Sequence, residues 1–455
     1  MMQFHSINPY TGDCLAVLPA HDAGHVERAL ARAAATAPVW REAGFLPRRA
    51  LLLQVARLLR EREGAYAALI AQEMGKPIRE ARAEVYKCAW CCEFYAGHGE
   101  AMLADEVIGS DARDSRVVRQ ALGAVLGIMP WNFPFWQVIR AAAPIMMAGN
   151  VFLLKHASNV PQCALALASL FRDAGAPEGV FQTLLVGSAV VPGLIADGRI
   201  HGVTLTGSER AGRQVAALAG AALKPVVMEL GGSDAFIVLE DADLDETLDQ
   251  AVLARFQNGG QSCIAAKRFI VQAGLAEDFA EGLAARIASL RHGDPLHEET
   301  DLGPLARADL REEVLAQVQA SLREGAGLRL GGVAIAGSQA GMQATLLTGV
   351  SPGMTAFDEE IFGPVACITE ARDEMHAVQL ANASRFGLGG SVWTRDAARG
   401  EALARALECG AAFVNGMVRS DPRLPFGGAK ASGLGRELGA DGLRAFTNAK
   451  TLWVA

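Results

Sequence analysis

The sequence has few of the features that mark nucleic-acid-binding or membrane proteins. Lysine and arginine together number 42 against 50 acidic residues, and the net charge at pH 7 is −8. Binding to DNA or RNA needs a clustered basic face, so this balance argues against a nucleic-acid partner. The most apolar stretch, residues 141–154, is shorter than a membrane span and is bounded or interrupted by Arg140 and Asn150. We therefore expect no membrane partner.

A secretory signal and a disulfide framework are missing as well. The N-terminal residues contain no basic region that leads into an apolar stretch. The eight cysteines are scattered along 455 residues, unlike those of disulfide-rich secreted domains. These absences predict a soluble, cytoplasmic protein with reduced thiols. Cys88, Cys91 and Cys92 lie close together, but no second Cys/His pair follows at a ligand spacing, so we expect helix packing there and no metal site.

The chain begins with helical periodicity and continues with alternating strands and helices. Apolar positions recur at helical spacing in residues 22–37, 47–74 and 76–102. From residue 125 onward, short apolar runs alternate with amphipathic stretches, which is typical of a parallel sheet covered on both faces. The predicted strands are 125–129, 151–155, 180–186, 202–205 and 225–229, with helices at 161–173 and 209–222. Nucleotides bind at the carboxyl ends of such strands.

The second half of the chain repeats this alternation. A strand at 235–239 precedes a helix at 244–256, and a strand at 268–271 precedes helices at 276–291 and 307–324. Further strands are predicted up to residue 414. No internal repeat, low-complexity tract or long flexible linker interrupts the pattern. The sequence therefore predicts an α/β protein with two α/β units.

Three short segments carry residue types that suit covalent catalysis. Cys263 ends the run Gly-Gln-Ser-Cys, Glu229 begins Glu-Leu-Gly-Gly, and Asn132 is the centre of Pro-Trp-Asn-Phe-Pro. A thiol can attack a carbonyl carbon, an amide can hold the resulting oxyanion, and a carboxylate can activate water against a thioester. A single cysteine would be weak support, because free cysteines usually pack as small buried hydrophobes. The combination indicates an enzyme.

In this order and spacing, the three segments resemble those of the aldehyde dehydrogenase superfamily. The resemblance extends to Thr-Gly-Ser at 206–208, Glu-Glu-Ile-Phe-Gly-Pro at 359–364, Pro-Phe-Gly-Gly at 425–428 and Ser-Gly-Leu-Gly-Arg-Glu at 432–437. It covers nearly the whole chain, from Asn8 to Lys450. The fold that it implies is α/β, with a Rossmann-like cofactor-binding domain, a second α/β catalytic domain and a small β oligomerisation arm.

The resemblance also implies where these parts begin and end. Residues 1–104 and 122–230 would form the cofactor-binding domain, and residues 231–442 the catalytic domain. Residues 105–121 and 443–455 would form the oligomerisation arm and a tail. In the family, this arm and tail lie over a neighbouring subunit, which implies a homodimer or homotetramer.

The family chemistry assigns each catalytic residue a role. Cys263 would attack an aldehyde as a thiolate, while Asn132 and the backbone N–H of Cys263 hold the oxyanion. After hydride transfer to a nicotinamide, Glu229 would draw a proton from the water that hydrolyses the thioester. Glu229 taken alone is equally compatible with a structural carboxylate at a sheet edge. With the other two residues, it implies an NAD(P)-dependent aldehyde dehydrogenase that releases a carboxylate.

The cofactor would be NADP or NAD. The usual Gly-x-Gly-x-x-Gly fingerprint is absent. Instead, Gly207 and Ser208 open a helix after a strand, where N–H groups suit a pyrophosphate, although Ser208 alone could be an ordinary cap. Lys155 matches a ribose-contacting lysine of the family, and Ser158 replaces the usual glutamate that repels a 2′-phosphate, which favours NADP or dual use. By resemblance, Trp131, Glu360 and Phe362 belong to the same cofactor site.

Among the relatives, the chain is most similar to bacterial succinate-semialdehyde dehydrogenases. In that group a cationic pocket holds the far carboxylate of the substrate, and Arg140, Ser420 and Phe426 match its residues. The second arginine expected in this pocket is Gln257 here, so Arg419, Arg423 or Lys267 would have to replace it. Arg140 could instead brace a helix. Trp136, four residues after Asn132, could face either the core or the substrate tunnel.

Other functions compete with this interpretation. The substrate could be another semialdehyde or a medium-chain aldehyde, handled by a broad-specificity enzyme. A CoA-acylating relative would commonly lack the hydrolytic glutamate, so Glu229 argues against that reaction. A non-catalytic structural or binding protein with this fold would not need Cys263, and a thiol hydrolase would have no use for NADP. Position 265 is alanine, so the redox-switch cysteine of some relatives is absent.

Overall fold

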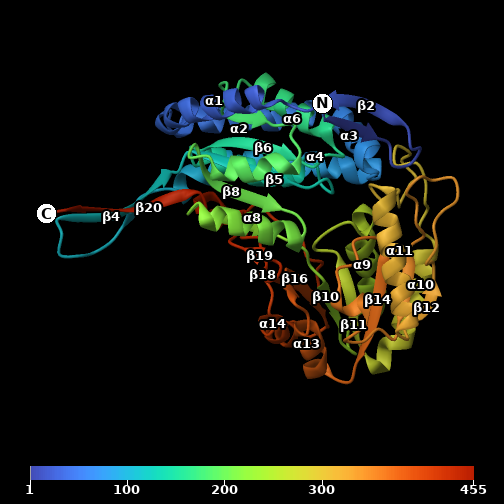
Figure 1. Cartoon of the computed structure of the whole chain (residues 1–455). Helices are drawn as coiled ribbons and strands as arrows, with labels where there is room; N and C mark the ends of the chain where they lie inside the picture. Colours follow the sequence, from blue (N-terminus) through green and yellow to red (C-terminus); the bar gives the residue numbers. More distant parts are fainter. Residues whose placement is uncertain (1) are drawn as a thin grey trace.

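The computed structural model describes residues 2–455, which form two sheet-containing bodies and one projecting arm (Figure 1). The upper body is built on a six-stranded sheet with the order β19-β9-β8-β5-β6-β7. Its strands are β5 (Ala124–Met129), β6 (Val151–His156), β7 (Phe181–Thr183), β8 (Ile200–Thr206), β9 (Val226–Glu229) and β19 (Gly433–Leu434). All neighbours are parallel except β19, which is antiparallel to β9. The carboxyl ends of the five consecutive parallel strands β9, β8, β5, β6 and β7 therefore share one edge.

Helices cover both faces of this sheet, as the apolar strand sequences predict. Figure 1 shows α1, α2 and α6 above the sheet and α8 below it. The helices of this body are α1 (Ala23–Glu42), α2 (Phe45–Glu61), α3 (Glu63–Met74), α4 (Ile78–Met102), α5 (Trp136–Met147), α6 (Pro161–Asp173), α7 (Val191–Ala196), α8 (Glu209–Ala221) and α15 (Gly439–Arg444). A hairpin of β1 (Gln3–Ile7) and β2 (Cys14–Pro19) packs at its edge through Phe4. The cysteines at 88, 91 and 92 are fully buried on α4.

Two predicted elements differ from those observed. The single helix expected over 47–74 is two helices, because Arg62 leaves the helical region with φ −108° and ψ 16°. Gly75 ends the second helix in the left-handed conformation, φ 83°. The strand expected over 180–186 pairs only over residues 181–183, since the N–H of Val186 bonds back to the carbonyl of Leu184 at 3.0 Å and turns the chain. These differences leave the strand ends of the candidate site unchanged.

The lower body holds a seven-stranded sheet with the order β12-β13-β14-β11-β10-β16-β17. All neighbouring pairs are parallel except β12 and β13. Its strands are β10 (Asp234–Val238), β11 (Ala266–Gln272), β12 (Gly327–Leu330), β13 (Thr345–Thr348), β14 (Val365–Ala371), β16 (Gly389–Trp393) and β17 (Ala411–Val414). The covering helices are α9 (Leu244–Phe256), α10 (Ala276–Ala288), α11 (Ala308–Arg323), α12 (Thr355–Asp358), α13 (Glu374–Asn382) and α14 (Ala397–Arg405). Strands β10, β11 and β16 are buried along their whole length, as expected for the middle of such a sheet.

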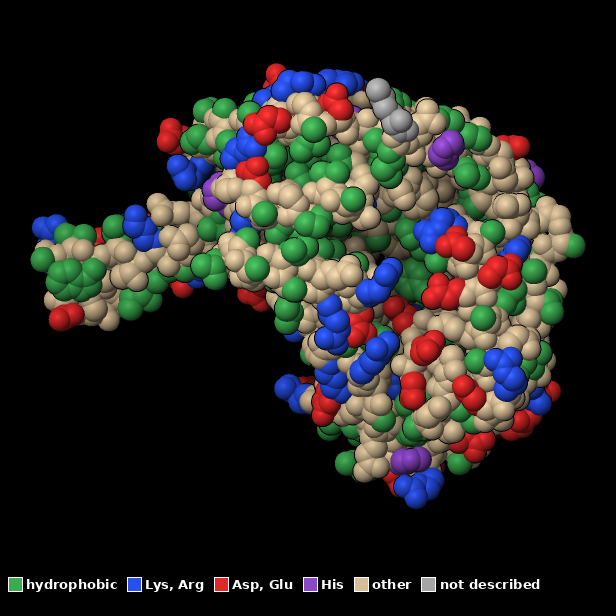
Figure 2. Space-filling view, in the orientation of Figure 1, with side chains coloured by type: hydrophobic (Ala, Val, Ile, Leu, Met, Phe, Trp, Pro, Cys, Tyr) green, Lys and Arg blue, Asp and Glu red, His purple; other side chains and the backbone are tan. Residues whose placement is uncertain are grey.

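The arm joins the two distant segments expected to form it. Strand β20 (Thr447–Val454) pairs antiparallel with β4 (Asp114–Ala121) over its entire length, and β3 (Glu106–Val107) completes the arm. Figure 2 shows the arm projecting from the main body with hydrophobic side chains on its surface, and Val107, Leu452 and Trp453 are among the exposed ones. No helix within residues 2–455 is long and apolar enough to cross a membrane.

The fold class is confirmed, whereas the four domain boundaries stay a prediction. One connection crosses the expected division: β19, which lies within residues 231–442, pairs with β9 of the upper sheet. A two-stranded sheet of β15 (Phe386–Gly387) and β18 (Ala429–Lys430) precedes this return. The chain therefore passes between the bodies more than once, which fixes the lower body against the upper sheet.

Candidate active site

The predicted site residues of the upper sheet lie at one edge. Strand β5 leads into Trp131 and Asn132, β6 carries Lys155 near its end, β8 runs into Gly207, and β9 ends at Glu229. These four strands are parallel neighbours, so their carboxyl ends face the same side. This is the position at which open α/β sheets bind ligands.

A distorted turn presents Cys263. The chain forms a 3₁₀ turn at Gln257–Gly260 in which Asn258, Gly259 and Gly260 all have positive φ, at 57°, 61° and 70°. A Cβ at Gly260 would lie 2.4 Å from the carbonyl oxygen of Gly363, so this close approach requires glycine. Backbone strain of this kind clusters at functional sites. The turn places Cys263 half-buried at the wall of a cavity of about 250 Å³.

Hydrogen bonds join this turn to Asn132. The Asn132 amide donates to the carbonyl of Gln261 at 3.0 Å, and the Asn258 amide donates to the carbonyl of Asn132 at 2.8 Å. Asn132 is 4% exposed. The structure therefore holds the Asn132 segment directly against the nucleophile turn, 131 positions away in the sequence.

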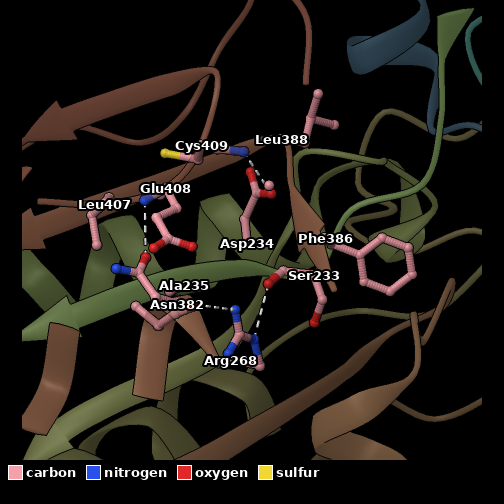
Figure 3. A pocket seen from close by; sticks show the side chains of 14 residues that line it. Ser233, Asp234, Ala235, Arg268, Asn382, Phe386, Leu388, Leu407, Glu408 and Cys409 are labelled. Atoms are coloured by element: carbon pink, nitrogen blue, oxygen red, sulfur yellow. Dashed lines mark hydrogen bonds between the residues drawn. The ribbon is translucent and has the colours of Figure 1, made fainter. Parts of the chain in front are cut away.

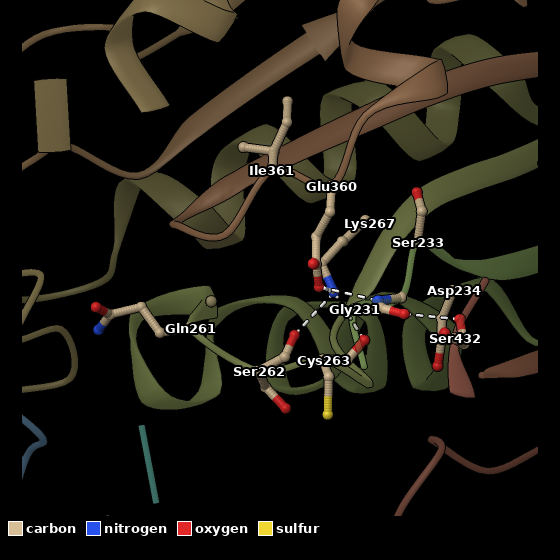
Figure 4. A network of polar contacts seen from close by, with 12 residues as sticks. Gly231, Ser233, Asp234, Gln261, Ser262, Cys263, Lys267, Glu360, Ile361 and Ser432 are labelled. Atoms are coloured by element: carbon tan, nitrogen blue, oxygen red, sulfur yellow. Dashed lines mark hydrogen bonds and ion pairs between the residues drawn. The ribbon is translucent and has the colours of Figure 1, made fainter. Parts of the chain in front are cut away.

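Lys267 links the nucleophile turn to two other predicted segments, as Figure 4 shows. Its ammonium donates to the carbonyls of Ser262 and Cys263, both at 2.8 Å, and lies 3.4 Å from Glu360. Glu360 in turn accepts the N–H of Gly232 at 3.0 Å. Because these contacts occupy its ammonium, Lys267 acts as a positioning residue and does not replace the missing pocket arginine. The sequence suggested Lys267 only as that replacement.

Glycine is required where the 229–232 segment meets its neighbours. A Cβ at Gly231 would lie 2.2 Å from Oε2 of Glu360, and one at Gly232 would lie 2.6 Å from the carbonyl oxygen of Cys263. The Glu-Leu-Gly-Gly segment therefore contacts both the predicted nucleophile and Glu360 of the predicted cofactor site. Any side chain at position 231 or 232 would force these groups apart.

The Cys263 thiol lies in an environment that favours its protonated form. Burial raises the pKa of Cys263 to about 12, while Arg140 and Lys267 act in the opposite direction. In this state the thiolate is scarce at neutral pH. A neighbouring proton acceptor or a bound ligand would be needed to produce it.

Glu229 ends β9 as a buried carboxyl without a partner. Neither of its oxygens forms a hydrogen bond with any residue in 2–455, and it is 2% exposed. Burial and the nearby Glu437 raise the pKa of Glu229 well above its usual value, against the effect of Arg140 and Arg436. Nearly all buried polar groups are hydrogen-bonded, so this exception calls for a role. A carboxyl that forms no other hydrogen bond among the described residues can accept a proton once it is ionised, so Glu229 suits proton transfer better than structural bracing.

The three predicted substrate-binding residues all line the cavity beside Cys263. Arg140, Ser420 and Phe426 lie on its wall together with Trp136 and Gln257. Trp136 is buried and also lines the cavity, so both of its expected positions apply. Of the three proposed replacements for the missing arginine, Arg419 lines the cavity but is exposed, and Arg423 is paired with Asp421 outside its wall.

Arg140 combines the two roles that sequence analysis left open. It is 2% exposed, forms an ion pair with Glu437 and donates to Thr206 Oγ1 at 3.2 Å. Its guanidinium also lies 4.9 Å from the centroid of the Phe426 ring. Arg140 therefore braces α5 against the upper sheet while it lines the cavity, and much of its charge is balanced by Glu437.

The predicted cofactor residues Lys155, Ser158 and Ser208 lie around the strand ends, outside the cavity beside Cys263. Lys155 is half-buried, makes no hydrogen bond or ion pair within the described chain, and has a pKa lowered by burial. Ser158 is exposed and lines a groove of about 480 Å³ between β1 and the start of α11. Ser208 caps α8 by accepting the N–H of Ala211 at 3.3 Å. An uncommitted lysine and a helix N-terminus at one sheet edge fit a phosphate-bearing nucleotide.

The aromatic part of this set lies nearer the nucleophile. Trp131 and Phe362 meet edge to face, with ring centroids 5.8 Å apart, and Phe362 lies 6.0 Å from the ammonium of Lys267. Glu360, the neighbour of Phe362, is held by Lys267 as described. These residues could pack and orient the nicotinamide end of a dinucleotide beside Cys263.

Two supporting residues, Arg255 and His156, carry no sequence motif that predicts their role. Arg255 is fully buried and donates to backbone carbonyls of Gly260, Ile361, Gly363 and Val365, so it fixes the nucleophile turn against the Glu360 loop. His156 lies 2.9 Å from the carbonyl of Pro134 and secures the Asn132 segment to β6; burial lowers its pKa to about 4. In the sequence, Arg255 is marked only as a charged residue in the final turn of an amphipathic helix.

A second cluster supports the segment that follows Glu229, as seen in Figure 3. Arg268 donates to the carbonyl of Ser233 at 2.9 Å, and Asp234 accepts the N–H of Gly389 at 3.0 Å. Burial raises the pKa of Asp234 to about 7. The small cavity among these residues measures about 10 Å³, which is room for one water. The cluster ties β10 to β16 behind the site.

Comparisons with known proteins agree with this architecture. Residues 2–452 match the model of the aldehyde dehydrogenase family. The chain is 51% identical over 454 residues to a probable succinate-semialdehyde dehydrogenase [NADP(+)] of Synechocystis sp., covering 100% of both chains. It is 50% identical to the succinate semialdehyde dehydrogenase [NAD(P)+] Sad of Escherichia coli, covering 98% of this chain and 97% of that one. The crystal structure of a succinic semialdehyde dehydrogenase from Streptococcus pyogenes in complex with NADP+ superposes with a TM-score of 0.97, at 37% identity and 99% coverage of both chains.

Proposed function

The chain belongs to the aldehyde dehydrogenase family, and from that membership we propose that it oxidises succinate semialdehyde to succinate with NADP+ or NAD+. The observation that carries the proposal is that the nucleophile turn of Cys263 packs against Asn132 and against the glycine pair after Glu229, beside a cavity lined by Arg140 and Ser420. A thiol hydrolase would not need the second, nucleotide-fitting surface at Lys155 and Ser208. A non-catalytic protein would not need a buried, unpartnered Glu229.

Cys263, Asn132 and Glu229 each perform a different step of the proposed reaction. The Cys263 thiol releases its proton to solvent, its sulfur bonds to the aldehyde carbon, and the carbonyl oxygen takes the π-bond electrons to become an oxyanion held by the Asn132 amide and the N–H of Cys263. A nicotinamide held by Trp131, Glu360 and Phe362 would supply the hydride acceptor that oxidation of the thiohemiacetal to a thioester requires. Glu229 then takes a proton from water, whose oxygen displaces the sulfur. Succinate leaves, and Cys263 is restored as a thiol.

For the cofactor, we propose that Lys155 and Ser158 bind the adenosine ribose and its 2′-phosphate. No carboxylate occupies position 158, so a 2′-phosphate meets no like charge there. The N-terminus of α8 at Gly207 and Ser208 would bind the pyrophosphate, and Trp131, Glu360 and Phe362 the nicotinamide riboside. The relatives from Synechocystis sp. and Escherichia coli, which carry NADP(+) and NAD(P)+ in their names, support this assignment.

For the assembly, we propose a cytoplasmic homodimer or homotetramer that forms through the arm. The exposed apolar residues of β3 and β20 would be covered by a neighbouring subunit. A reduced Cys263 is required for catalysis, which suits a reducing compartment.

The test is reduced-cofactor formation from succinate semialdehyde and from butanal, its uncharged analogue of the same length. We expect wild type to favour the acid-tailed substrate by tenfold or more in kcat/KM, about 1.4 kcal/mol, and Arg140→Ala to reduce that preference. Equal turnover of both substrates would instead indicate a broad-specificity aldehyde dehydrogenase, as the glutamine at 257 favours. No reduced cofactor from either substrate would contradict the proposal.

A further inference from the structure

The cavity beside Cys263 is lined by a lysine side chain that no sequence motif indicated. We propose that Lys87 of α4, together with Ser420, binds the remote carboxylate of the substrate and so replaces the arginine missing at position 257. This inference rests on the proposed function and names a residue that determines its substrate class.

Helix α4 forms one wall of the cavity through a single face. Glu80, Ala83, Glu84 and Lys87, at helical spacing, all line the cavity. Lys87 is half-buried, its ammonium donates to Ser420 Oγ at 2.8 Å, and it lies 4.4 Å from the centroid of the Trp136 ring. Gln257 lines the same cavity. A cation from α4 therefore shares the pocket in which sequence analysis expected a cation from the nucleophile turn.

The other cations near this pocket are committed elsewhere or lie at its rim. Arg140 is paired with Glu437, Lys267 binds two backbone carbonyls, and Arg423 is paired with Asp421. Arg419 lines the cavity but is exposed to solvent, where a charge contributes little binding energy. Lys87, by contrast, forms no ion pair with any carboxylate in residues 2–455.

The acidic residues on the same wall do not neutralise the positive charge of Lys87. Glu84 forms an ion pair with Lys76 and accepts the N–H groups of Phe135 and Trp136 at 2.9 and 3.0 Å. Glu80 accepts the N–H of Asn258 at 2.6 Å, and burial raises its pKa to about 7. Because both glutamates are engaged in these contacts, the ammonium of Lys87 leaves this wall of the cavity positively charged.

An ammonium in this position has unused capacity for an anion. Lysine has three N–H donors, and Ser420 takes one of them. A carboxylate would accept a second from Lys87, with the Ser420 hydroxyl as a further donor, in charge-assisted hydrogen bonds that are about twice as strong as neutral ones. An uncharged aldehyde would leave the ammonium without a counter-ion. The pocket therefore selects aldehydes with an acidic tail.

The proposal also predicts how selectivity changes with pH. Burial lowers the pKa of Lys87 to about 8, with a smaller contribution from Arg140. Lys87 is positively charged below that pH and loses its charge as the pH rises through it. The titratable and charged groups that face it are Glu80, Glu84, Cys88 and Cys91 on α4, Arg140 on α5, and Arg419 and Asp421 on the loop before Phe426. Since kcat/KM reports the free enzyme, the preference for the acid-tailed substrate should decline above about pH 8.

The experiment compares kcat/KM for succinate semialdehyde and butanal in wild type, Lys87→Met and Lys87→Arg. Methionine keeps much of the side-chain length without the charge, and arginine restores the charge. We expect Lys87→Met to lower the preference ratio by tenfold or more and Lys87→Arg to restore most of it. Lys430→Met, which removes an exposed lysine paired with Glu408, is the control and should leave the ratio unchanged.

The outcomes separate this inference from the proposed function. If wild type forms no reduced cofactor with either substrate, the proposed function is wrong. If wild type prefers succinate semialdehyde and Lys87→Met keeps that preference, the function stands and the role of Lys87 is refuted. Should Lys87→Met fail to fold, wild type and Lys87→Arg are measured between about pH 6 and 10. The ratio should fall through about pH 8 in wild type but persist to higher pH in Lys87→Arg, and a flat wild-type ratio would refute the inference.

Discussion

At the scale of single residues, the site combines a protonated thiol, an uncommitted carboxyl and an amide whose position is fixed by the backbone. Asn132 holds its place by donating to the carbonyl of Gln261, which leaves one amide N–H for a ligand. Asn258, which contacts Asn132 across the turn, adopts a positive φ. Two hydrogen bonds from its side-chain amide hold it in this conformation. The residues that perform the proposed chemistry are thus positioned before any substrate arrives, which is how an oxyanion site lowers a barrier.

Replacing the oxyanion donor should reduce turnover sharply. For Asn132→Ala we expect kcat to fall by about 10²- to 10³-fold, because one lost donor typically costs about 2.7–4 kcal/mol in the transition state. Steady-state kinetics and thermal melting, measured together, check this. A comparable loss accompanied by a large drop in melting temperature would show instead that Asn132 mainly secures the nucleophile turn.

The protonation state of the nucleophile is open to direct measurement. Because burial raises the pKa of Cys263 to about 12, alkylation of the cofactor-free protein by iodoacetamide should accelerate about tenfold per pH unit from about pH 7 to 10. Peptide mass spectrometry can follow Cys263 and, as an internal reference for exposed thiols, Cys14 in one sample. A rate at Cys263 that levels off near pH 7 would show that the thiolate is already formed.

At the scale of elements, buried cations join loops that the sequence separates widely. Arg255 at the end of α9 holds four carbonyls of the nucleophile turn and the Glu360 loop, and Lys267 on β11 holds two more. Helix α4 contributes a wall of the cavity although it carries none of the family motifs. The geometry of the site therefore depends on elements outside the motifs.

Removing the Arg255 guanidinium should loosen this junction. Arg255→Met leaves several buried carbonyls without donors, each at about 1–3 kcal/mol, so we expect a loss of several kcal/mol in unfolding free energy. Urea unfolding would measure it, and reduced-cofactor formation should fall as the turn loses order. Arg286→Met on α10, whose partners Asp245 and Asp249 are exposed, is a matched control with little expected change.

The same elements show which parts of the site could be predicted from the sequence and which could not. Residues 229, 132 and 263 were found because each sits in a motif of fixed spacing, and the strands were found because parallel strands are continuously apolar. Lys87 and Arg255 were missed because a charged residue on an amphipathic helix is usually a solvated one, and only tertiary packing shows which helix face meets the cavity. The break at Arg62 was missed because the apolar spacing continues through it.

At the scale of the whole molecule, the arm leaves apolar surface without cover in the single chain. Strands β4 and β20 pair over eight residues and project away from both bodies (Figure 1). Trp453 is 55% exposed there. A small, exposed, apolar element of this kind is expected to be covered by another copy of the chain.

A charge on the arm should therefore dissociate the proposed oligomer. For Trp453→Asp we expect a smaller species by light scattering coupled to size-exclusion chromatography, with each chain still folded by circular dichroism. Leu223→Asp places the same change on an exposed apolar residue outside the arm and should leave the mass unchanged. A wild-type monomer, or an unaltered mass for Trp453→Asp, would contradict assembly through the arm.

In the proposed mechanism, oxidation passes through a thioester on Cys263 that Glu229 helps to hydrolyse. The most direct measurement mixes Glu229→Gln rapidly with NADP+ and succinate semialdehyde, follows NADPH absorbance, and then determines the mass of the Cys263 peptide. We expect a burst of about one NADPH per active site followed by near arrest, with a succinyl group retained on Cys263. Steady turnover at the wild-type rate, or a burst without acylated Cys263, would contradict it.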